Sequence, residues 1–298
     1  IVFVAEHCPT RRQTLLFSAT YPEGIEKLAN QFLRHPQEVK LLEQHEDSKI
    51  RQRFYEVKHE ERLLAVAILL KHYRPISTLA FCNTKQQCRD LLDVLHAQGF
   101  HALTLNGDLE QRERDQVLIQ FANRSCSVLV ATDVAARGLD IDRLEAVINV
   151  DVTPDPEIYI HRIGRTGRAD EDGWAFSLCS PRDRRRVDTI ARMTGSEPEW
   201  HTLGSLQSGN DDALLPPMVT LQILGGRKEK IRPGDVLGAL TAEVPGARTF
   251  TREQVGKITV TDQSTYVAVA RELAGEAVRK LSTGKVKGKI VKVRALEN

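Results

Sequence analysis

Apolar and polar residues follow two different periods along the first two thirds of the chain. Short apolar runs, typical of buried strands, occur at 13–20, 50–57, 78–81, 102–105, 127–131, 146–149 and 175–179. Between them apolar residues recur with helical spacing, which predicts helices over 23–33, 60–72, 86–96, 111–121, 158–163 and 182–193. Strands that alternate with helices indicate parallel βαβ units. We therefore expect a three-layer α/β domain with a parallel sheet covered by helices on both faces.

The pattern changes after residues 205–217, a polar segment that contains glycine and ends in two prolines, as linkers do. Beyond it we expect strands at 219–224, 255–260, 264–270 and 288–296 and helices over 232–243 and 271–281. The order βαββαβ within 218–298 is that of the split-βαβ folds, which include the RNA-recognition motif (RRM). The second domain is therefore predicted to be RRM-like, although the fold alone does not establish RNA binding.

The composition of the 298 residues is that of a globular protein, with 41% hydrophobic and 28% charged residues. The longest apolar run, 63–70, is far too short to cross a membrane, and the amino terminus lacks a signal-peptide pattern. The five cysteines form no Cys-x-x-Cys pair, which argues against a disulfide framework or a zinc site. We expect a cytoplasmic protein with reduced thiols, no metal ligands of its own and no membrane partner.

The net charge of +2 conceals an asymmetry between the two predicted domains. Residues 218–298 contain 15 Lys and Arg against 8 Asp and Glu, a net charge of +7. The rest of the chain has 27 against 32, a net charge of −5. A basic module on an acidic body indicates a polyanionic partner such as nucleic acid. Charge alone leaves open a lysine-rich surface that is merely solvated.

Residues 161–168, His-Arg-Ile-Gly-Arg-Thr-Gly-Arg, are the most distinctive segment for chemistry. Three arginines beside two glycines allow guanidinium groups and backbone to approach phosphate oxygens closely. So many charged side chains in one short segment are not expected in a core. His161, Arg165 and Arg168 would share one face of a helix, although the two glycines weaken a helical assignment.

A second segment combines a buried strand with polar residues at its carboxyl end. Residues 128–131 are apolar and are followed by Thr132, Asp133, Gly138 and Asp140. Ligands of open α/β sheets bind at the carboxyl ends of strands. There Gly138 would allow close backbone approach to a nucleotide, and Asp140 would accept a hydrogen bond from a ribose hydroxyl. Taken by itself, Asp133 is better explained as a helix N-cap.

These segments resemble the C-terminal RecA-like domain of the DEAD-box RNA helicases, a branch of helicase superfamily 2. The matching segments are Ser18-Ala19-Thr20 (motif III), 79–84 (motif IV), Gly107 with Gln111 and Arg114 (motif IVa), 128–140 (motif V) and 161–168 (motif VI). Their order makes the resemblance specific over about residues 10–195. It implies a RecA-like fold and an ATP-dependent RNA helicase that uses ATP and Mg²⁺.

The resemblance also implies roles for individual residues. Arg165 and Arg168 match arginine fingers, which stabilise charge on the γ-phosphate during phosphoryl transfer. ATP contacts are further implied for Gly138 and Asp140. The residues implied in coupling the nucleotide state to RNA are Ser18, Thr20 and His161. Those implied in RNA-backbone contacts are Asn83, Thr84, Gly107, Gln111, Arg114 and Thr132.

The sequence departs from the family pattern where the phosphates and the metal should be held. It contains neither Gly-x-x-x-x-Gly-Lys-Ser/Thr nor Asp-Glu-Ala-Asp. By resemblance, both belong to a first RecA-like domain, whose tail end we expect in 1–45, before the second RecA-like domain in 46–204. ATP and Mg²⁺ would then be bound mainly by the missing domain, and we expect no ATP hydrolysis by this chain alone.

Residues 218–298 resemble the C-terminal RNA-binding module of a bacterial branch of the same family, through 231–240, 256–260, 264–270 and 284–289. The likeness implies an RRM variant that binds 23S ribosomal RNA in the precursor of the large (50S) subunit. Usual RRMs stack bases on aromatic residues, but the central strands here offer only Tyr266. The residues implied in binding are Arg227, Lys228, Tyr266, Lys285, Lys287, Lys289 and Arg294. Plain solvation of each lysine and a core position for Tyr266 are equally good explanations.

Three functions therefore remain open. The first is an RNA-dependent ATPase and helicase, of which this chain is the C-terminal part. The second is a non-catalytic RNA-binding or scaffolding protein, an alternative supported by the missing phosphate cradle. The third, a DNA translocase of the same superfamily, fits the basic module poorly. Two intact arginine fingers favour the helicase, because a scaffold has no need of them.

Overall fold

The computed structural model describes residues 2–17, 29–39, 50–136, 141, 144–167, 172–206, 214–244 and 248–296. The chain divides into two compact units, Ile1–Asp47 and Ser48–Asn298. In the first unit, helix α1 (Val2–Glu6) was not expected, and the strand predicted from residue 13 is wrong over 13–17, where Phe17 is 87% exposed. These residues have no neighbouring strand in the described part of their unit to pair their backbone groups. The rest of that strand, and the helix predicted at 23–33 up to residue 28, lie outside the described residues.

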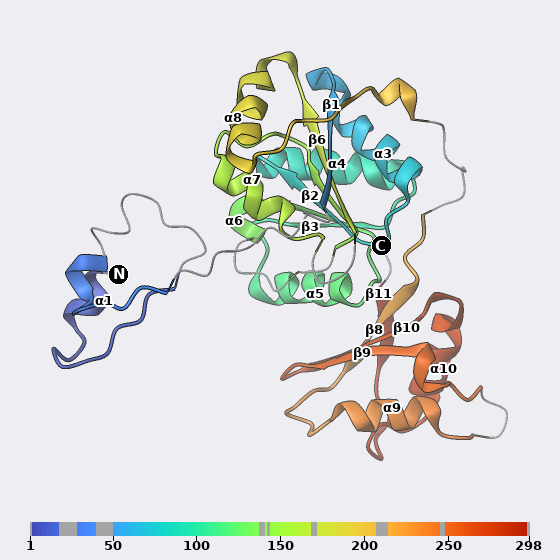
Figure 1. Cartoon of the computed structure of the whole chain (residues 1–298). Helices are drawn as coiled ribbons and strands as arrows, with labels where there is room; N and C mark the ends of the chain where they lie inside the picture. The colour runs from blue at the N-terminus through green and yellow to red at the C-terminus, as the bar shows by residue number, and fades with distance from the viewer. Residues whose placement is uncertain are drawn as a thin grey trace. The chain divides into compact units, whose positions relative to one another are not determined.

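The second unit begins with a parallel seven-stranded sheet in the order β3-β4-β2-β5-β6-β1-β7 (Figure 1). Its strands are β1 (Ile50–Glu56), β2 (Thr78–Cys82), β3 (Ala102–Leu105), β4 (Val128–Thr132), β5 (Ala146–Asn149), β6 (Gly173–Cys179) and β7 (Trp200–His201). Its helices are α3 (Arg62–Tyr73), α4 (Lys85–Ala97), α5 (Gln111–Ala122), α6 (Asp133–Ala136), α7 (Pro156–Ile163) and α8 (Arg184–Thr194). The predicted α/β architecture is confirmed; only the short β7 and α6 were missed.

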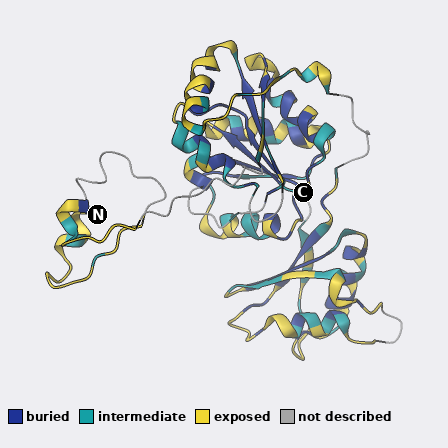
Figure 2. Ribbon diagram, in the orientation of Figure 1, coloured by how far each residue is buried: buried dark blue, intermediate teal, exposed yellow. Residues whose placement is uncertain are grey.

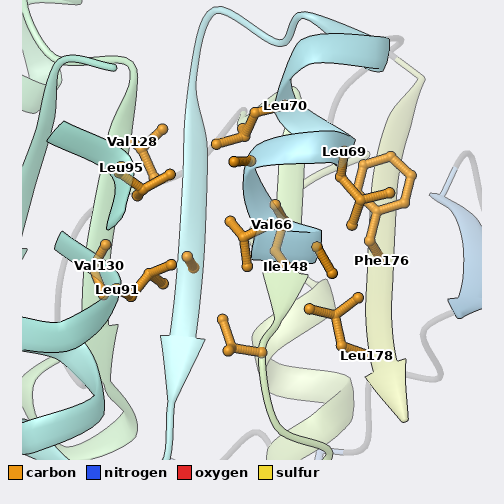
Figure 3. Close-up of a cluster of buried hydrophobic side chains, with 14 of the residues drawn as sticks. Val66, Leu69, Leu70, Leu91, Leu95, Val128, Val130, Ile148, Phe176 and Leu178 are labelled. Atoms are coloured by element: carbon orange, nitrogen blue, oxygen red, sulfur yellow. The ribbon is translucent and has the colours of Figure 1, made fainter. Parts of the chain in front are cut away.

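The core of this domain lies on both faces of the sheet. Successive residues of β2 point to opposite faces, so Ala80 and Cys82 join the cluster beneath α3 and α4, whereas Leu79 and Phe81 join the cluster beneath α5. Figure 3 shows the first cluster, with Leu91 and Leu95 of α4 beside Val130 and Val128 of β4, and Leu69 of α3 beside Phe176 of β6. In Figure 2 the strands are buried between exposed helix surfaces. Burial of each such large side chain contributes about 1.5–3 kcal/mol.

The module after the linker has an antiparallel four-stranded sheet in the order β11-β8-β10-β9. Its elements are β8 (Met218–Leu224), α9 (Pro233–Thr241), β9 (Val255–Val260), β10 (Ser264–Ala270), α10 (Ala274–Thr283) and β11 (Val293–Leu296). The predicted βαββαβ order is confirmed. The last strand is shorter than predicted, because Lys287 and Gly288 have φ values of 51° and 78° and turn the chain back on itself. In that turn, Lys289 donates its backbone N–H to the carbonyl of Val286 at 3.1 Å.

Four of the five cysteines are buried free thiols, and Cys8 is an exposed one. Burial raises the pKa of Cys126 and that of Cys179 to about 12, so both thiols stay protonated at neutral pH. Within the described ranges, no group of three or more His, Cys, Asp or Glu side chains could hold a metal ion. A helix long and apolar enough to span a membrane does not occur in the described part of the chain.

Candidate nucleotide and RNA site

The predicted motif residues after β2 and β4 lie side by side at one edge of the sheet. The two strands are paired with Cys82 opposite Thr132, so Asn83 and Asp133, the next residues, leave the sheet at the same edge. Asn83 is exposed and Thr132 is half-buried. Thr84 caps α4, since its Oγ1 accepts the backbone N–H of Gln87 at 3.1 Å. This edge therefore presents the residues expected from motifs IV and V together.

Arg162 on α7 joins the strand ends. The side chain donates from Nε and one Nη to the two carboxylate oxygens of Asp133, both at 2.7 Å. The other Nη donates to Oδ1 of Asn149 at 3.2 Å and to the backbone oxygen of Asp151 at 2.8 Å. A longer bond of 3.4 Å reaches Oδ1 of Asn83. Partners from three segments, at 83, 133 and 149–151, thus converge on one guanidinium.

Two sequence expectations fail at Arg162. This side chain is 2% exposed, although the charged residues of 161–168 were expected to stay out of the core. A bidentate carboxylate and three further oxygen acceptors replace the water that the guanidinium loses on burial. The simple N-cap explanation of Asp133 is also incomplete, because Asp133 opens α6 while its carboxylate is held by Arg162.

A second buried arginine, Arg62 at the start of α3, extends this network. It is 6% exposed and forms ion pairs with Asp151 and with Asp183, the latter at 2.7 Å. Burial alone would raise the pKa of Asp183, but the backbone and hydroxyl of Ser180 and the Arg62 guanidinium bring this pKa below its usual value. Sequence reasoning missed Arg62, Asp151 and Asp183. The available signal was a charged residue at, or just after, the end of a buried strand.

The motif IVa residues lie at the start of α5. Arg114 donates to the backbone oxygen of Ala135 at 2.6 Å and so attaches α5 to α6, which follows the motif V strand. The side-chain amide of Gln111 donates to Asp115 at 2.7 Å. Gly107 is exposed and lies beside Lys85; a Cβ there would be 3.6 Å from the ammonium nitrogen. Motifs IVa and V are therefore linked through the Arg114 contact.

The expected arginine fingers follow α7, whose exposed His161 lies next to Arg162. The helix ends at Ile163, so Arg165 lies in the turn beyond it, and the single helical face considered for His161 and Arg165 is not formed. This turn is fixed by the backbone oxygen of Arg165, which accepts the N–H of Leu144 at 3.2 Å. Five predicted residues, Ser18, Thr20, Gly138, Asp140 and Arg168, lie outside the described residues.

The predicted basic residues of the module come together on two loops. Arg227 and Lys228 lie between β8 and α9, and Lys285, Lys287 and Lys289 surround the turn before β11. Lys287 donates from Nζ to the backbone oxygen of Lys230, which joins the two loops. We call this set the two-loop basic surface: Arg227, Lys228, Lys230, Lys285, Lys287 and Lys289, all exposed.

Tyr266 lies in the central strand β10 and is 3% exposed. Its hydroxyl accepts a hydrogen bond from Nε2 of Gln222 at 3.3 Å, and Oε1 of Gln222 accepts one from Nε of Arg294 at 2.8 Å. These three residues form one cross-strand row, on the sheet face opposite to the side chains of Leu221 and Ile223 that enter the module core. Stacking of a base on Tyr266 stays a prediction, and the exposed charge lies on the loops.

The chain matches two family models in the order of its domains. Residues 59–170 match the helicase conserved C-terminal domain, and residues 220–295 match the DbpA RNA binding domain. It is 44% identical over 296 residues to the ATP-dependent RNA helicase DbpA of Escherichia coli K12, an alignment that covers 99% of this chain and 63% of that protein. The identity to DbpA of Bacillus subtilis 168 is 30% over 311 residues, covering 97% and 64%.

A solved structure of S. cerevisiae Dbp5 bound to RNA and ADP–BeF3 is also similar, with a TM-score of 0.61 and 28% identity. The matched region covers 67% of this chain and 54% of that one. The chain thus spans less than two thirds of the length of either DbpA relative. Together with the confirmed fold and the ordered motifs, these matches identify the family: the chain belongs to the DEAD-box RNA helicases and is DbpA-like, with a helicase C-terminal domain followed by a DbpA RNA-binding domain.

Proposed function

We propose that the chain is the C-terminal part of an ATP-dependent helicase that opens short duplexes of 23S ribosomal RNA during assembly of the large ribosomal subunit, in the cytoplasm. Its second RecA-like domain would occupy 46–204 and its RNA-binding module 218–298. One observation carries this proposal. Arg162 fastens α7, which leads into Arg165, to the strand end that bears Asn83. The nucleotide-facing and RNA-facing sides of the domain therefore share one buried polar network.

The nucleotide would bind between this domain and a first RecA-like domain. Arg165 and Arg168 would contact the γ-phosphate, with Gly138 and Asp140 beside the rest of the nucleotide. The turn that carries Arg165 fits this task because its backbone is fixed to Leu144. We assign Mg²⁺ to carboxylates of the first domain, since the described residues offer no cluster that would hold it.

RNA would be bound at two places. The strand ends at Asn83, Thr84 and Thr132, with Gly107, Gln111 and Arg114, would contact the sugar–phosphate backbone without reading sequence. The two-loop basic surface would hold the module on its ribosomal RNA target. Attachment of the module raises the effective concentration of the helicase domain near one duplex.

ATP hydrolysis by the longer polypeptide, with its own first RecA-like domain, tests the proposal. We expect RNA-stimulated phosphate release that falls about 10³-fold or more in Arg165→Ala, because a finger stabilises the transition state to that extent. Arg182→Ala, an exposed arginine of the same domain, is the matched control and should leave the rate unchanged. The 298-residue chain alone should release no more phosphate than its Arg165→Ala/Arg168→Ala variant.

Other outcomes would favour the alternatives. A longer reading frame without a phosphate cradle, combined with tight RNA binding, would support the non-catalytic scaffold. Equal affinity for RNA and DNA in a filter-binding comparison would support the DNA translocase. Phosphate release that is indifferent to Arg165→Ala would contradict the role assigned to the finger.

A further inference from the structure

A pocket of about 280 Å³ lies at the amino ends of β1 and β6, at the sheet edge opposite to the polar network. Its lining comes from β1, from Trp174 of β6 and from the segment after α8. The lining residues are Ile50, Arg51, Gln52, Arg53, Trp174, Ser196, Glu197 and Glu199. None of them belongs to the motifs discussed above. The pocket is therefore a feature that the proposed function does not use.

Arg53 is the unusual member of this lining. Its half-buried guanidinium lies 4.9 Å from the ring centre of Trp174 and 5.7 Å from that of Tyr73. One Nη donates to the hydroxyl of Tyr73 at 2.5 Å. Among the described residues, no carboxylate forms an ion pair with Arg53. The cation is thus partly withdrawn from water without a counter-ion, whereas buried charges are ordinarily paired.

The other arginines of this domain that lie on an aromatic ring do have a carboxylate partner. Arg51 shares the Trp174 ring with Arg53 and pairs with Asp172 at 2.6 Å. Arg184 lies 5.1 Å from the ring centre of Trp200 and pairs with Glu56 at 2.5 Å. Arg162, over Phe81, pairs with Asp133. Ring stacking alone therefore does not account for the missing partner of Arg53.

The residues of the pocket wall limit the chemistry of an anion that could pair with Arg53. A guanidinium fork fits a carboxylate or a phosphate equally well. Glu197 and Glu199 line the same pocket, so a ligand that fills it needs hydrogen-bond donors as well as an anionic group. The volume of about 280 Å³ has room for one small ligand and not for an extended polyanion, which limits the ligand to one phosphate-bearing unit. A ribose carries hydroxyl donors next to its phosphate, whereas an acidic peptide offers mainly carboxylates.

We propose that this pocket binds the phosphate of a single ribonucleotide unit. Arg53 contacts the phosphate, and Glu197 and Glu199 accept hydrogen bonds from the ribose hydroxyls. The unit comes either from a free nucleotide or from the phosphorylated 5′ end of an RNA. This site goes beyond the proposed function, because none of its lining residues belongs to the motifs to which the nucleotide and RNA contacts are assigned.

The chain provides its own reporter for the test. It contains two tryptophans, so Trp200→Phe leaves Trp174 as the only one, in the wall of the pocket. We expect AMP, or a short RNA with a 5′-phosphate, to change Trp174 fluorescence saturably. Adenosine, and the same RNA with a 5′-hydroxyl, should not. A response to AMP only identifies a free nucleotide as ligand, and a response to the phosphorylated RNA only identifies an RNA end.

Titration calorimetry with the chain that retains Trp200 measures the affinity for AMP and tests whether Arg53 contacts its phosphate. Arg53→Gln should weaken AMP binding about tenfold or more, the effect of removing hydrogen bonds to a charged group. Arg184→Gln removes an arginine that also lies on a tryptophan ring but is exposed and has its own carboxylate, and it should leave the affinity unchanged. Arg53→Lys keeps the positive charge but lacks the forked guanidinium, and its affinity for AMP should lie between those of the wild-type chain and of Arg53→Gln. If Arg53→Gln lowers the melting temperature, the AMP affinity of Arg53→Lys shows whether the loss of binding comes from the missing guanidinium or from unfolding.

Four results would overturn the proposal: no saturable signal with any of these probes, adenosine binding as tightly as AMP, equal losses in Arg53→Gln and Arg184→Gln, or preferential binding of tri-aspartate. The last result would identify an acidic peptide as the partner. These outcomes are independent of the proposed helicase activity, which is measured by RNA-stimulated phosphate release in the longer polypeptide.

Discussion

The two buried arginines of the helicase domain, Arg162 and Arg62, connect different elements. Arg162 unites strand ends with the helix that precedes Arg165, and Arg62 joins Asp151 to Asp183 at the far end of the same network. A buried ion pair contributes little net stability against an apolar replacement, but removal of one partner leaves a buried charge uncompensated. The network therefore fixes the position of candidate site residues and makes the domain sensitive to single substitutions.

Asp183 makes this sensitivity measurable through pH. Because its pKa is lowered in the folded chain, the unfolded state binds the proton more readily on acidification. The stability contributed by Asp183 is fully present above its ordinary pKa of about 4 and is lost as the pH falls through the lowered value. Asp183→Asn should cost about 1–3 kcal/mol at neutral pH and should flatten the loss of stability below about pH 4.

Urea unfolding at a series of pH values checks this prediction. Asp188→Asn, an exposed carboxylate on α8, is the matched control and should preserve the wild-type profile. An Asp183→Asn chain with an unchanged acid profile would mean that its ion pair with Arg62 does not persist in solution.

At the scale of elements, the position of residues 164–167, here called the finger turn because it carries the proposed finger Arg165, depends on a close backbone approach. A Cβ on Gly173 at the start of β6 would lie 2.1 Å from Oγ1 of Thr166 and 2.4 Å from the backbone nitrogen of Gly167. Thr166 is fully buried and donates to the backbone oxygen of Leu144. Only glycine at position 173 allows β6 to pass this near to the turn that carries Arg165.

Gly173→Ala should therefore displace the finger turn. We expect a decrease of about 1–3 kcal/mol in the free energy of unfolding, the usual cost of overpacking, and slower phosphate release by the longer polypeptide. Gly204→Ala is the control, since a Cβ there meets nothing within 4 Å. Thermal unfolding and the ATPase rate provide the two measurements, and equal behaviour of both variants would contradict the close approach.

At the scale of the whole molecule, the helicase domain and the module have separate cores and opposite charge. The module core is built from its own strands and helices, with Leu221 and Val267 among its fully buried residues. The excess basic residues of 218–298 lie on the surface of the module, and six of them form the two-loop basic surface. RNA binding by this module should therefore depend strongly on ionic strength.

The salt dependence of RNA affinity tests that surface. Lys285→Gln/Lys289→Gln should reduce the slope of log affinity against log salt by about 1.4, or about 0.7 for each phosphate of a single strand that a lysine no longer neutralises. Lys58→Gln/Lys71→Gln, which removes the same charge from the helicase domain, should leave the slope nearly unchanged. Filter binding between low and physiological salt gives both slopes, and an equal effect of the two pairs would refute a localised basic surface.

Local patterns of apolar and polar residues in the sequence predicted most of the architecture. Alternating apolar runs and helical periods predicted the elements between Ile50 and Thr194, because each strand or helix buries its own apolar residues. The motif spacing singled out Asn83, Thr132 and Arg165 as candidates, and the structure shows them at or just after the ends of strands or helices. Short elements such as β7, which has two residues, were not predicted, because a periodic pattern can be recognised only over several residues.

Only the tertiary structure decided which charged side chains are buried and which, among the described residues, form no ion pair with a carboxylate. Arg162 and Arg165 lie three residues apart in one motif, yet Arg162 enters the network because Asp133 and Asn149 reach it from other strands. Arg53, in contrast, donates to the hydroxyl of Tyr73 and forms no ion pair with a carboxylate of the described residues, because none of these folds within ion-pair distance of it. The amino-acid sequence by itself determined the elements and their motifs. Whether a charged side chain is buried and paired was decided by packing, because its hydrogen-bond partners come from segments that are distant in sequence.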